Sequence, residues 1–215
     1  MPIGNMGVGN VSNFRWRSVA RSLSLLGFSL GSLAAASAGE GFHSGIYEGL
    51  MLAVDPAGDV TGVYREAQGE GVTKTCSFDL FGKATQNAAP VTTRNTQAFP
   101  GQLAADDKAV TLKIEKGREH PGCGLVLLPE IAEGLSLDLT AATDWTQLRR
   151  IVSPRAYFYA DAAGHDKTKV YVVSGDVVGV TATEGPWLKV EYWRDGARKA
   201  AGWIGPDDSK PIGAP

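Results

Sequence analysis

The sequence predicts an all-β protein: an antiparallel β-barrel or sandwich of about eight short strands, followed by a second, smaller barrel. Two observations support this fold class. The 215 residues include 27 Gly and 11 Pro spread without a period, which suits many strands and turns better than long helices. Several segments also alternate apolar and polar residues, the period of a strand with one buried face.

Residues 1–38 have the layout of a signal peptide. Arg15, Arg17 and Arg21 precede an apolar run at 23–36, and Ala36-Ser37-Ala38 is a suitable cleavage site. The run is short and rich in Ser and Gly, whereas a membrane span needs about 20 apolar residues. A signal-anchor helix is the alternative. We therefore expect cleavage before Gly39, export to the periplasm or the extracellular space, and no stable membrane span after cleavage.

Residues 39–145 read as one antiparallel β domain. The alternation is clearest where Cys76, Phe78 and Leu80 share one face of a predicted strand. Residues 83–100 are polar and weakly patterned and hold at most a short strand around 91–94, so we expect a plain loop or a binding loop there. The strands expected in this domain cover residues 46–54, 60–66, 73–81, 110–115, 125–128 and 135–139.

Cys76 and Cys123 are the only two cysteines. In an exported protein such a pair most simply forms a disulfide, and two reduced thiols are the alternative if the protein is not exported. The bridge would hold the adjacent His120, Pro121 and Gly122 rigid at a barrel rim. This segment is a candidate inhibitory loop that enters the cleft of another protein, or it merely anchors two strands.

Charge is distributed unevenly along the chain. Residues 39–145 contain eight basic and 15 acidic side chains, a net charge of −7, whereas residues 146–215 contain ten basic and eight acidic ones. The acidic domain argues against nucleic acid as a partner, because phosphate binding needs a basic surface. It would attract a cationic protein, such as a cationic cell-wall hydrolase.

Residues 146–215 form the predicted second domain. Residues 143–150 lack a strand pattern and suggest a linker or one helical turn. The tail from Pro206 is expected to be disordered. The strands expected between them cover residues 156–159, 170–173, 177–181, 187–192 and 202–204.

Three motifs in this region resemble bacterial SH3 domains: Ser174-Gly175-Asp176, Gly185-Pro186-Trp187-Leu188-Lys189-Val190 and Gly202-Trp203-Ile204. The resemblance covers residues 151–215 and implies an SH3-like barrel. It also implies that the module binds a cell-wall peptide or a segment of an envelope protein in an aromatic groove. The alternative for Trp187 and Trp203 is packing in the barrel core. The binding candidates are Tyr157, Tyr159, Trp187, Tyr192, Trp193 and Trp203.

No catalytic motif accompanies these features. There is no Gly-x-Ser-x-Gly sequence, and His43, His120 and His165 are isolated from one another, without metal-ligand spacing. We expect no metal, no cofactor and no enzymatic activity. The sequence thus favours an exported, non-catalytic protein of the bacterial envelope that acts by binding. The alternatives are an inhibitor or immunity protein against a cell-wall hydrolase, and an enzyme with its site in the N-terminal β domain.

Overall fold

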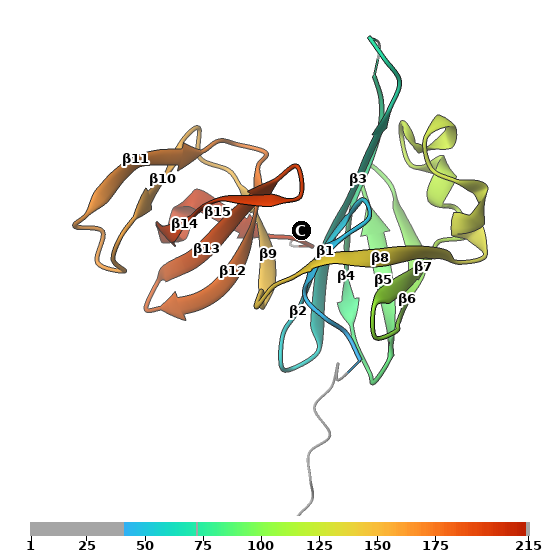
Figure 1. Cartoon of the computed structure of the whole chain (residues 1–215), viewed down its shortest axis with the longest axis horizontal. Coiled ribbons are helices and arrows are strands. Elements are labelled where there is room, and N and C mark those ends of the chain that lie inside the picture. Colours follow the sequence, from blue (N-terminus) through green and yellow to red (C-terminus); the bar gives the residue numbers. More distant parts are fainter. Residues whose placement is uncertain (1–40, 72, 214–215) are drawn as a thin grey trace, which may run out of the picture. The chain divides into compact units, whose positions relative to one another are not determined.

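Eight antiparallel strands close into a β-barrel in the computed structural model, which describes residues 41–71 and 73–213. The strands follow one another around the barrel, and β8 pairs with β1 to close it (Figure 1). They are β1 (Gly45–Tyr47), β2 (Leu50–Val54), β3 (Asp59–Gln68), β4 (Lys74–Lys83), β5 (Ala88–Arg94), β6 (Ala98–Ala105), β7 (Ala109–Lys113) and β8 (Leu135–Ala142). The all-β prediction is confirmed, and the barrel is the correct one of its two N-terminal alternatives. The predicted signal peptide lies outside the described residues.

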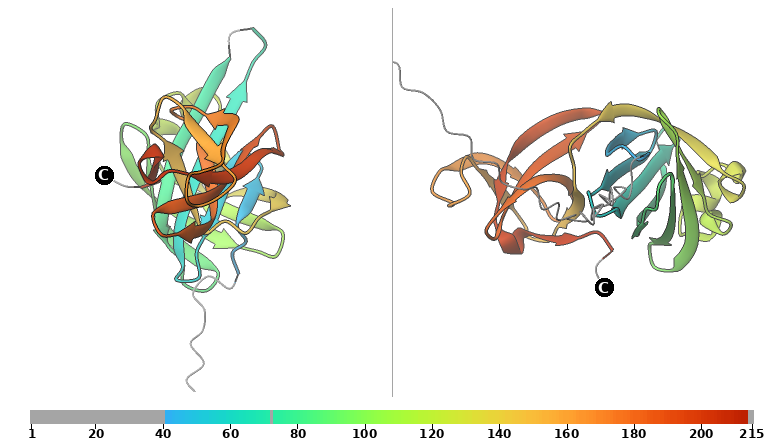
Figure 2. Two further views of the ribbon diagram at one scale, coloured as in Figure 1. Left: turned by 90° about the vertical axis from the view of Figure 1, so that its left-hand side faces the viewer. Right: turned by 90° about the horizontal axis from the view of Figure 1, so that it is seen from below.

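The barrel interior is filled by the alternating apolar residues of its strands. Cys76, Phe78 and Leu80 of β4 are all buried, as the period of two predicted, and so are Val110 and Leu112 of β7. The β3–β4 hairpin extends beyond the other strands and turns at Gly69 and Gly71 (Figures 1 and 2). Both glycines have positive φ, which suits a tight turn.

The short strand allowed around 91–94 is part of β5, but the loop predicted for the rest of residues 83–100 is wrong, because most of this segment forms the hairpin of β5 and β6. Its inward positions are Ala89, Val91, Thr93 and Phe99, all buried. Because small and polar residues occupy alternate positions of this segment, its hydrophobicity does not show the alternation typical of a strand. Prolines in these two strands do not prevent the pairing.

The strand predicted at residues 125–128 is also wrong. Three short 3-10 helices occupy this region: η1 (Gly117–Glu119), η2 (Cys123–Leu125) and η3 (Pro129–Ala132). Gly122 adopts a left-handed conformation that redirects the chain into η2, and Pro129 starts η3. Val126 and Leu127 are buried beneath the barrel end, whereas Leu125 remains 73% exposed.

The rest of the chain forms a seven-stranded curled sheet with the order β11-β10-β14-β13-β12-β9-β15. Its edge strands β11 and β15 do not pair with each other, so the closed form predicted for this region is not found. The strands are β9 (Gln147–Ile151), β10 (Ala156–Tyr159), β11 (Lys167–Val172), β12 (Val177–Glu184), β13 (Trp187–Arg194), β14 (Ala197–Ile204) and β15 (Ser209–Pro211).

Two expectations for this region are corrected. The predicted linker at residues 143–150 contains most of β9, which pairs with β12 and β15. The tail expected to be disordered contains the 3-10 helix η4 (Pro206–Asp208) and β15, and it buries Ser209 and Ile212. Both strands are too short for a periodicity to show in the sequence, and tertiary pairing decides their structure.

Aliphatic side chains, with Phe158, form the core of the sheet. Trp187 and Trp203 are only half-buried, so the alternative that places them in this core is wrong. The buried members of this core are Ile151, Ala156, Phe158, Val172, Val178, Val180, Val190 and Ile204.

A third hydrophobic cluster joins the outer side of the barrel to the sheet. Ala53 and Val63 come from β2 and β3, and they pack with Trp145, Leu148 and Val177. Strand β3 is therefore buried on both of its faces from Val60 to Tyr64. Polar contacts support the junction: the Leu148 N–H donates to Thr61 Oγ1 (2.8 Å), and Arg150 forms an ion pair with Asp79. Within residues 41–71 and 73–213, no helix is long and apolar enough to cross a membrane.

Candidate functional site

Five aromatic side chains share one face of the C-terminal sheet. Tyr157 and Tyr159 flank the buried Phe158 on β10, so they point to the side opposite the core. The register places Tyr171 opposite Tyr157, and Trp203 opposite both Tyr159 and Lys189. Trp187 lies two residues before Lys189 and therefore on the same face. We call Tyr157, Tyr159, Tyr171, Trp187 and Trp203 the aromatic face.

The rings of this face contact one another and remain accessible. Tyr159 and Trp187 pack edge to face with centroids 5.1 Å apart, and the rings of Tyr157 and Tyr171 lie 5.5 Å apart. All five side chains are half-buried or exposed, and Tyr171 is 43% exposed. Aromatic surface that is held in place but accessible can stack on a ligand at little entropic cost.

The loop between β10 and β11 is ordered around the aromatic face. Gly164 has a φ of +72°, and a Cβ there would lie 2.6 Å from the Trp187 ring, so the loop backbone lies directly against this indole. The Asp161 carboxylate accepts hydrogen bonds from the backbone N–H groups of Ala163 and His165. The hydrogen bond from His165 is the main cause that lowers the pKa of Asp161, so this turn keeps its charged anchor.

Two cations lie over rings of the aromatic face. Lys167 Nζ lies 3.6 Å from the centroid of the Tyr157 ring, and Arg155 Cζ lies 5.0 Å from that of Tyr171. Cation–π contacts of this kind hold the charge beside the aromatic surface. The face can therefore combine stacking with attraction for a carboxylate.

The two other aromatic candidates, Tyr192 and Trp193, lie outside the aromatic face: Tyr192 packs against the core side of the sheet, and Trp193 lies on the same side of β13 as Trp187 but at the other end of the strand. They lie near the opposite end of β13, beside the barrel. The Tyr192 hydroxyl donates to Asp176 Oδ1 (3.2 Å), and the Trp193 ring packs edge to face with Trp145 at 6.0 Å. The structure thus divides the six residues predicted from the sequence into two groups.

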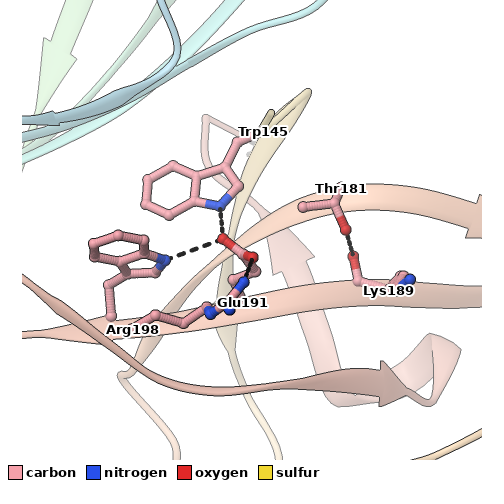
Figure 3. Close-up of polar contacts among 6 residues, drawn as sticks. Trp145, Thr181, Lys189, Glu191 and Arg198 are labelled. Atoms are coloured by element: carbon pink, nitrogen blue, oxygen red, sulfur yellow. Dashed lines mark hydrogen bonds and ion pairs between the residues drawn. The ribbon is translucent and has the colours of Figure 1, made fainter. Parts of the chain in front are cut away.

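Glu191 connects the second group to the junction with the barrel. Its Oε2 accepts hydrogen bonds from the indole N–H groups of Trp145 and Trp193, each at 3.1 Å, and its Oε1 accepts one from Arg198 at 2.6 Å (Figure 3). Burial alone raises the pKa of Glu191, but the hydrogen bonds from Arg198, Trp193 and Trp145 outweigh it and lower the pKa. An ionised carboxylate with three donors is a structural anchor for both indoles.

The predicted disulfide is present between Cys76 and Cys123. The adjacent His120 is only 1% exposed and lies between two rings, with its centroid 4.8 Å from Phe78 and 4.8 Å from Phe99. His120 therefore cannot be the tip of a protruding inhibitory loop, although Pro121 and Gly122 are exposed. A histidine flanked by a proline and two glycines gave no sign of burial in the sequence.

The tautomer of His120 follows from its one hydrogen bond. Thr93 Oγ1 donates to the Phe99 carbonyl (3.1 Å), so it accepts the proton of His120 Nε2 (2.9 Å). His120 Nδ1 is then unprotonated and has no hydrogen-bond partner among the described residues. Protonation would place an unpaired charge in the barrel interior, and this burial lowers the pKa of His120.

The barrel should consequently lose stability in mild acid. Below pH 6.5 the unfolded chain binds a proton at His120 that the folded chain does not, so the free energy of unfolding falls as the pH falls toward the lowered pKa. We expect His120→Phe, which keeps the ring stack, to reduce this dependence of the free energy of unfolding on pH below pH 6.5. Urea unfolding at several pH values measures it, with the exposed His165→Asn as control. An unchanged slope in His120→Phe contradicts this role.

The remaining histidines do not assemble a metal site. His43 and His165 are both exposed, and within residues 41–71 and 73–213 no group of three or more His, Cys, Asp or Glu side chains could hold a metal ion.

Comparison with known proteins gives no relative: no family model, no curated protein and no solved structure matches the chain. Tyr171, Arg155 and Lys167 belong to the site but are not among the residues predicted from the sequence. The apolar run at 170–173 predicted a strand that includes Tyr171, but only the register places Tyr171 opposite Tyr157.

Proposed function

We propose that this protein is an exported, non-catalytic binding protein of the bacterial envelope. In this proposal its C-terminal part is an SH3-type module that holds a cell-wall peptide, or a segment of an envelope protein, against the aromatic face. The observation that supports it most is the gathering of five accessible rings and two cations on one side of a single sheet.

The strand order supports the SH3-type part of the proposal. Strands β12, β13 and β14 form a meander, β9 pairs with both β12 and β15, and the short helix η4 precedes the last strand. The three motifs of the resemblance lie at a turn, at the start of β13 and at the end of β14. Because a fold alone does not fix a function, the residues of the aromatic face are the main support for binding.

The chemistry of the face suits a peptide with acidic groups. Exposed rings stack on apolar and planar parts of a ligand, and Arg155 and Lys167 attract its carboxylates. Export is supported by the signal-peptide layout of residues 1–38 and by the disulfide, a bond typical of oxidising compartments.

Purified sacculi test this proposal. The full mature chain is incubated with sacculi at increasing salt concentrations, and the retained fraction is measured after sedimentation. We expect the retained fraction to fall as the salt concentration rises but not to vanish. Salt screens the attraction between the cations and the carboxylates of the ligand, whereas it does not screen aromatic stacking. No retention at any salt concentration would remove the cell-wall ligand.

The inhibitor alternative has less support. The barrel carries the acidic charge that it requires, but His120, the central residue of its proposed loop, is buried. The disulfide anchors this segment to the barrel interior, where Cys76 and Cys123 are fully buried.

A further inference from the structure

A cleft of about 470 Å³ lies between the outer side of the barrel and the β13–β14 hairpin. Ile46, Met51 and Val63 of the barrel line one side of it, and Trp193 of the sheet lines the other. These residues belong to the third hydrophobic cluster or pack against it, so the floor of the cleft is apolar and held by the junction. The volume falls in the range of roughly 300–1,000 Å³ that is typical of ligand sites.

Two guanidinium groups line the same cleft. Arg65 comes from β3 and Arg194 from the end of β13. Neither forms an ion pair within the described part of the chain, and the ring of Tyr192 lies 6.0 Å from Arg194 Cζ. Both are exposed and can therefore turn toward an anion in the cleft.

Two carboxylates complete the lining. Asp176 is fixed by the backbone N–H of Val173 at Oδ2 (2.9 Å) and by the Tyr192 hydroxyl at Oδ1 (3.2 Å). Asp195 lies at the hairpin turn with a φ of 53°, followed by Gly196 at 69°. This backbone conformation is typical of a tight two-residue hairpin turn. The turn therefore fixes the backbone position from which the Asp195 side chain extends.

We propose that this cleft binds a short zwitterionic peptide of two or three residues with apolar side chains. Its carboxylate is held by Arg65 and Arg194, its ammonium group by Asp176 and Asp195, and its side chains lie on the apolar floor beside Trp193. A purely anionic ligand would leave the two carboxylates of the cleft without a partner, and a purely cationic ligand would leave the two guanidinium groups without one. A zwitterion pairs with both sets of charges. The site lies beside the barrel and is distinct from the aromatic face, so it extends the proposed function and does not depend on it.

Calorimetry with blocked and unblocked peptides tests the proposal. The probes are leucyl-phenylalanine, its N-acetylated form, its C-terminal amide and free leucine, titrated into the full mature chain. We expect leucyl-phenylalanine to bind, and each of the other three probes to bind about tenfold more weakly. The acetylated form lacks the ammonium charge, the amide lacks the carboxylate charge, and free leucine lacks the apolar area of the second side chain. No binding of leucyl-phenylalanine, or equal binding of its blocked forms, overturns the proposal.

Exposed variants assign the charges. Arg65→Gln should lower the affinity for leucyl-phenylalanine about tenfold and leave the affinity for its C-terminal amide unchanged. Asp195→Asn should also lower the affinity for leucyl-phenylalanine about tenfold, but leave the affinity for the N-acetylated form unchanged. Lys199→Gln, an exposed cation of β14 outside this cleft, is the matched control and should change nothing. Unchanged affinity in both cleft variants contradicts the site. Trp187→Ala should leave dipeptide binding intact, so failure of the aromatic face and failure of the cleft give different results.

Discussion

Replacing Cys76 and Cys123 together with alanine is expected to lower the free energy of unfolding by about 4 kcal/mol. The bridge closes a segment of 47 residues, and the loss of chain entropy in the unfolded state for such a loop corresponds to about 4 kcal/mol. It also joins β4 to η2, two elements that are not paired by backbone hydrogen bonds. Urea unfolding followed by circular dichroism measures the change.

Reduction of the unmutated protein with dithiothreitol is the matched control. It breaks the same bond without removing side-chain volume, so it separates the bridge from the small cavity that alanine creates. We expect both treatments to have nearly the same effect. A loss below about 1 kcal/mol in both experiments would mean that the barrel does not depend on the bridge.

Trp145→Ala is expected to lower the free energy of unfolding by about 3–5 kcal/mol, the range for removal of a buried tryptophan. The indole is 1% exposed and lies in the cluster that joins the barrel to the sheet. It fits closely, because a Cβ at Gly179 would lie 2.2 Å from its ring. The substitution also removes the hydrogen bond to Glu191 and the edge contact with Trp193. Urea unfolding measures the loss of stability, and the indole N–H resonance of Trp193 in the NMR spectrum reports the loss of these contacts.

Trp145→Phe is the matched control for this prediction. It keeps an aromatic ring in the cluster but removes the N–H group, so it should cost about 2 kcal/mol, the value of a hydrogen bond to a charged group. If Trp145→Ala costs no more than Trp145→Phe, the apolar contacts of the indole do not stabilise the junction.

The sequence predicted those parts of the fold that are encoded by local alternation. Cys76, Phe78 and Leu80 revealed the inward face of β4 because apolar and polar residues alternate there. The cysteine pair predicted the disulfide because only two cysteines are present.

Features decided by tertiary contacts could not be predicted. Strands β5 and β6 contain small and polar residues at positions that the barrel nevertheless buries, such as Thr93. The position of Trp145 in the junction cluster depends on Gly179, which is distant in the sequence. The candidate site shows the same limit: the aromatic residues could be named, but only the packing of the sheet shows that Trp187 joins the Tyr159 ring, whereas Trp193, at the other end of β13, packs beside the barrel.

Sacculus retention of Trp187→Ala relative to the unmutated protein tests the central claim most directly. The indole lies on the aromatic face and contacts Tyr159, and loss of a stacking ring from a binding surface typically costs about tenfold or more in affinity. Leu125→Ala, which removes the 73% exposed leucine at the barrel end, controls for nonspecific adhesion. We predict a retained fraction near background for Trp187→Ala and an unchanged one for Leu125→Ala. Equal retention of Trp187→Ala and the unmutated protein would contradict binding through the aromatic face.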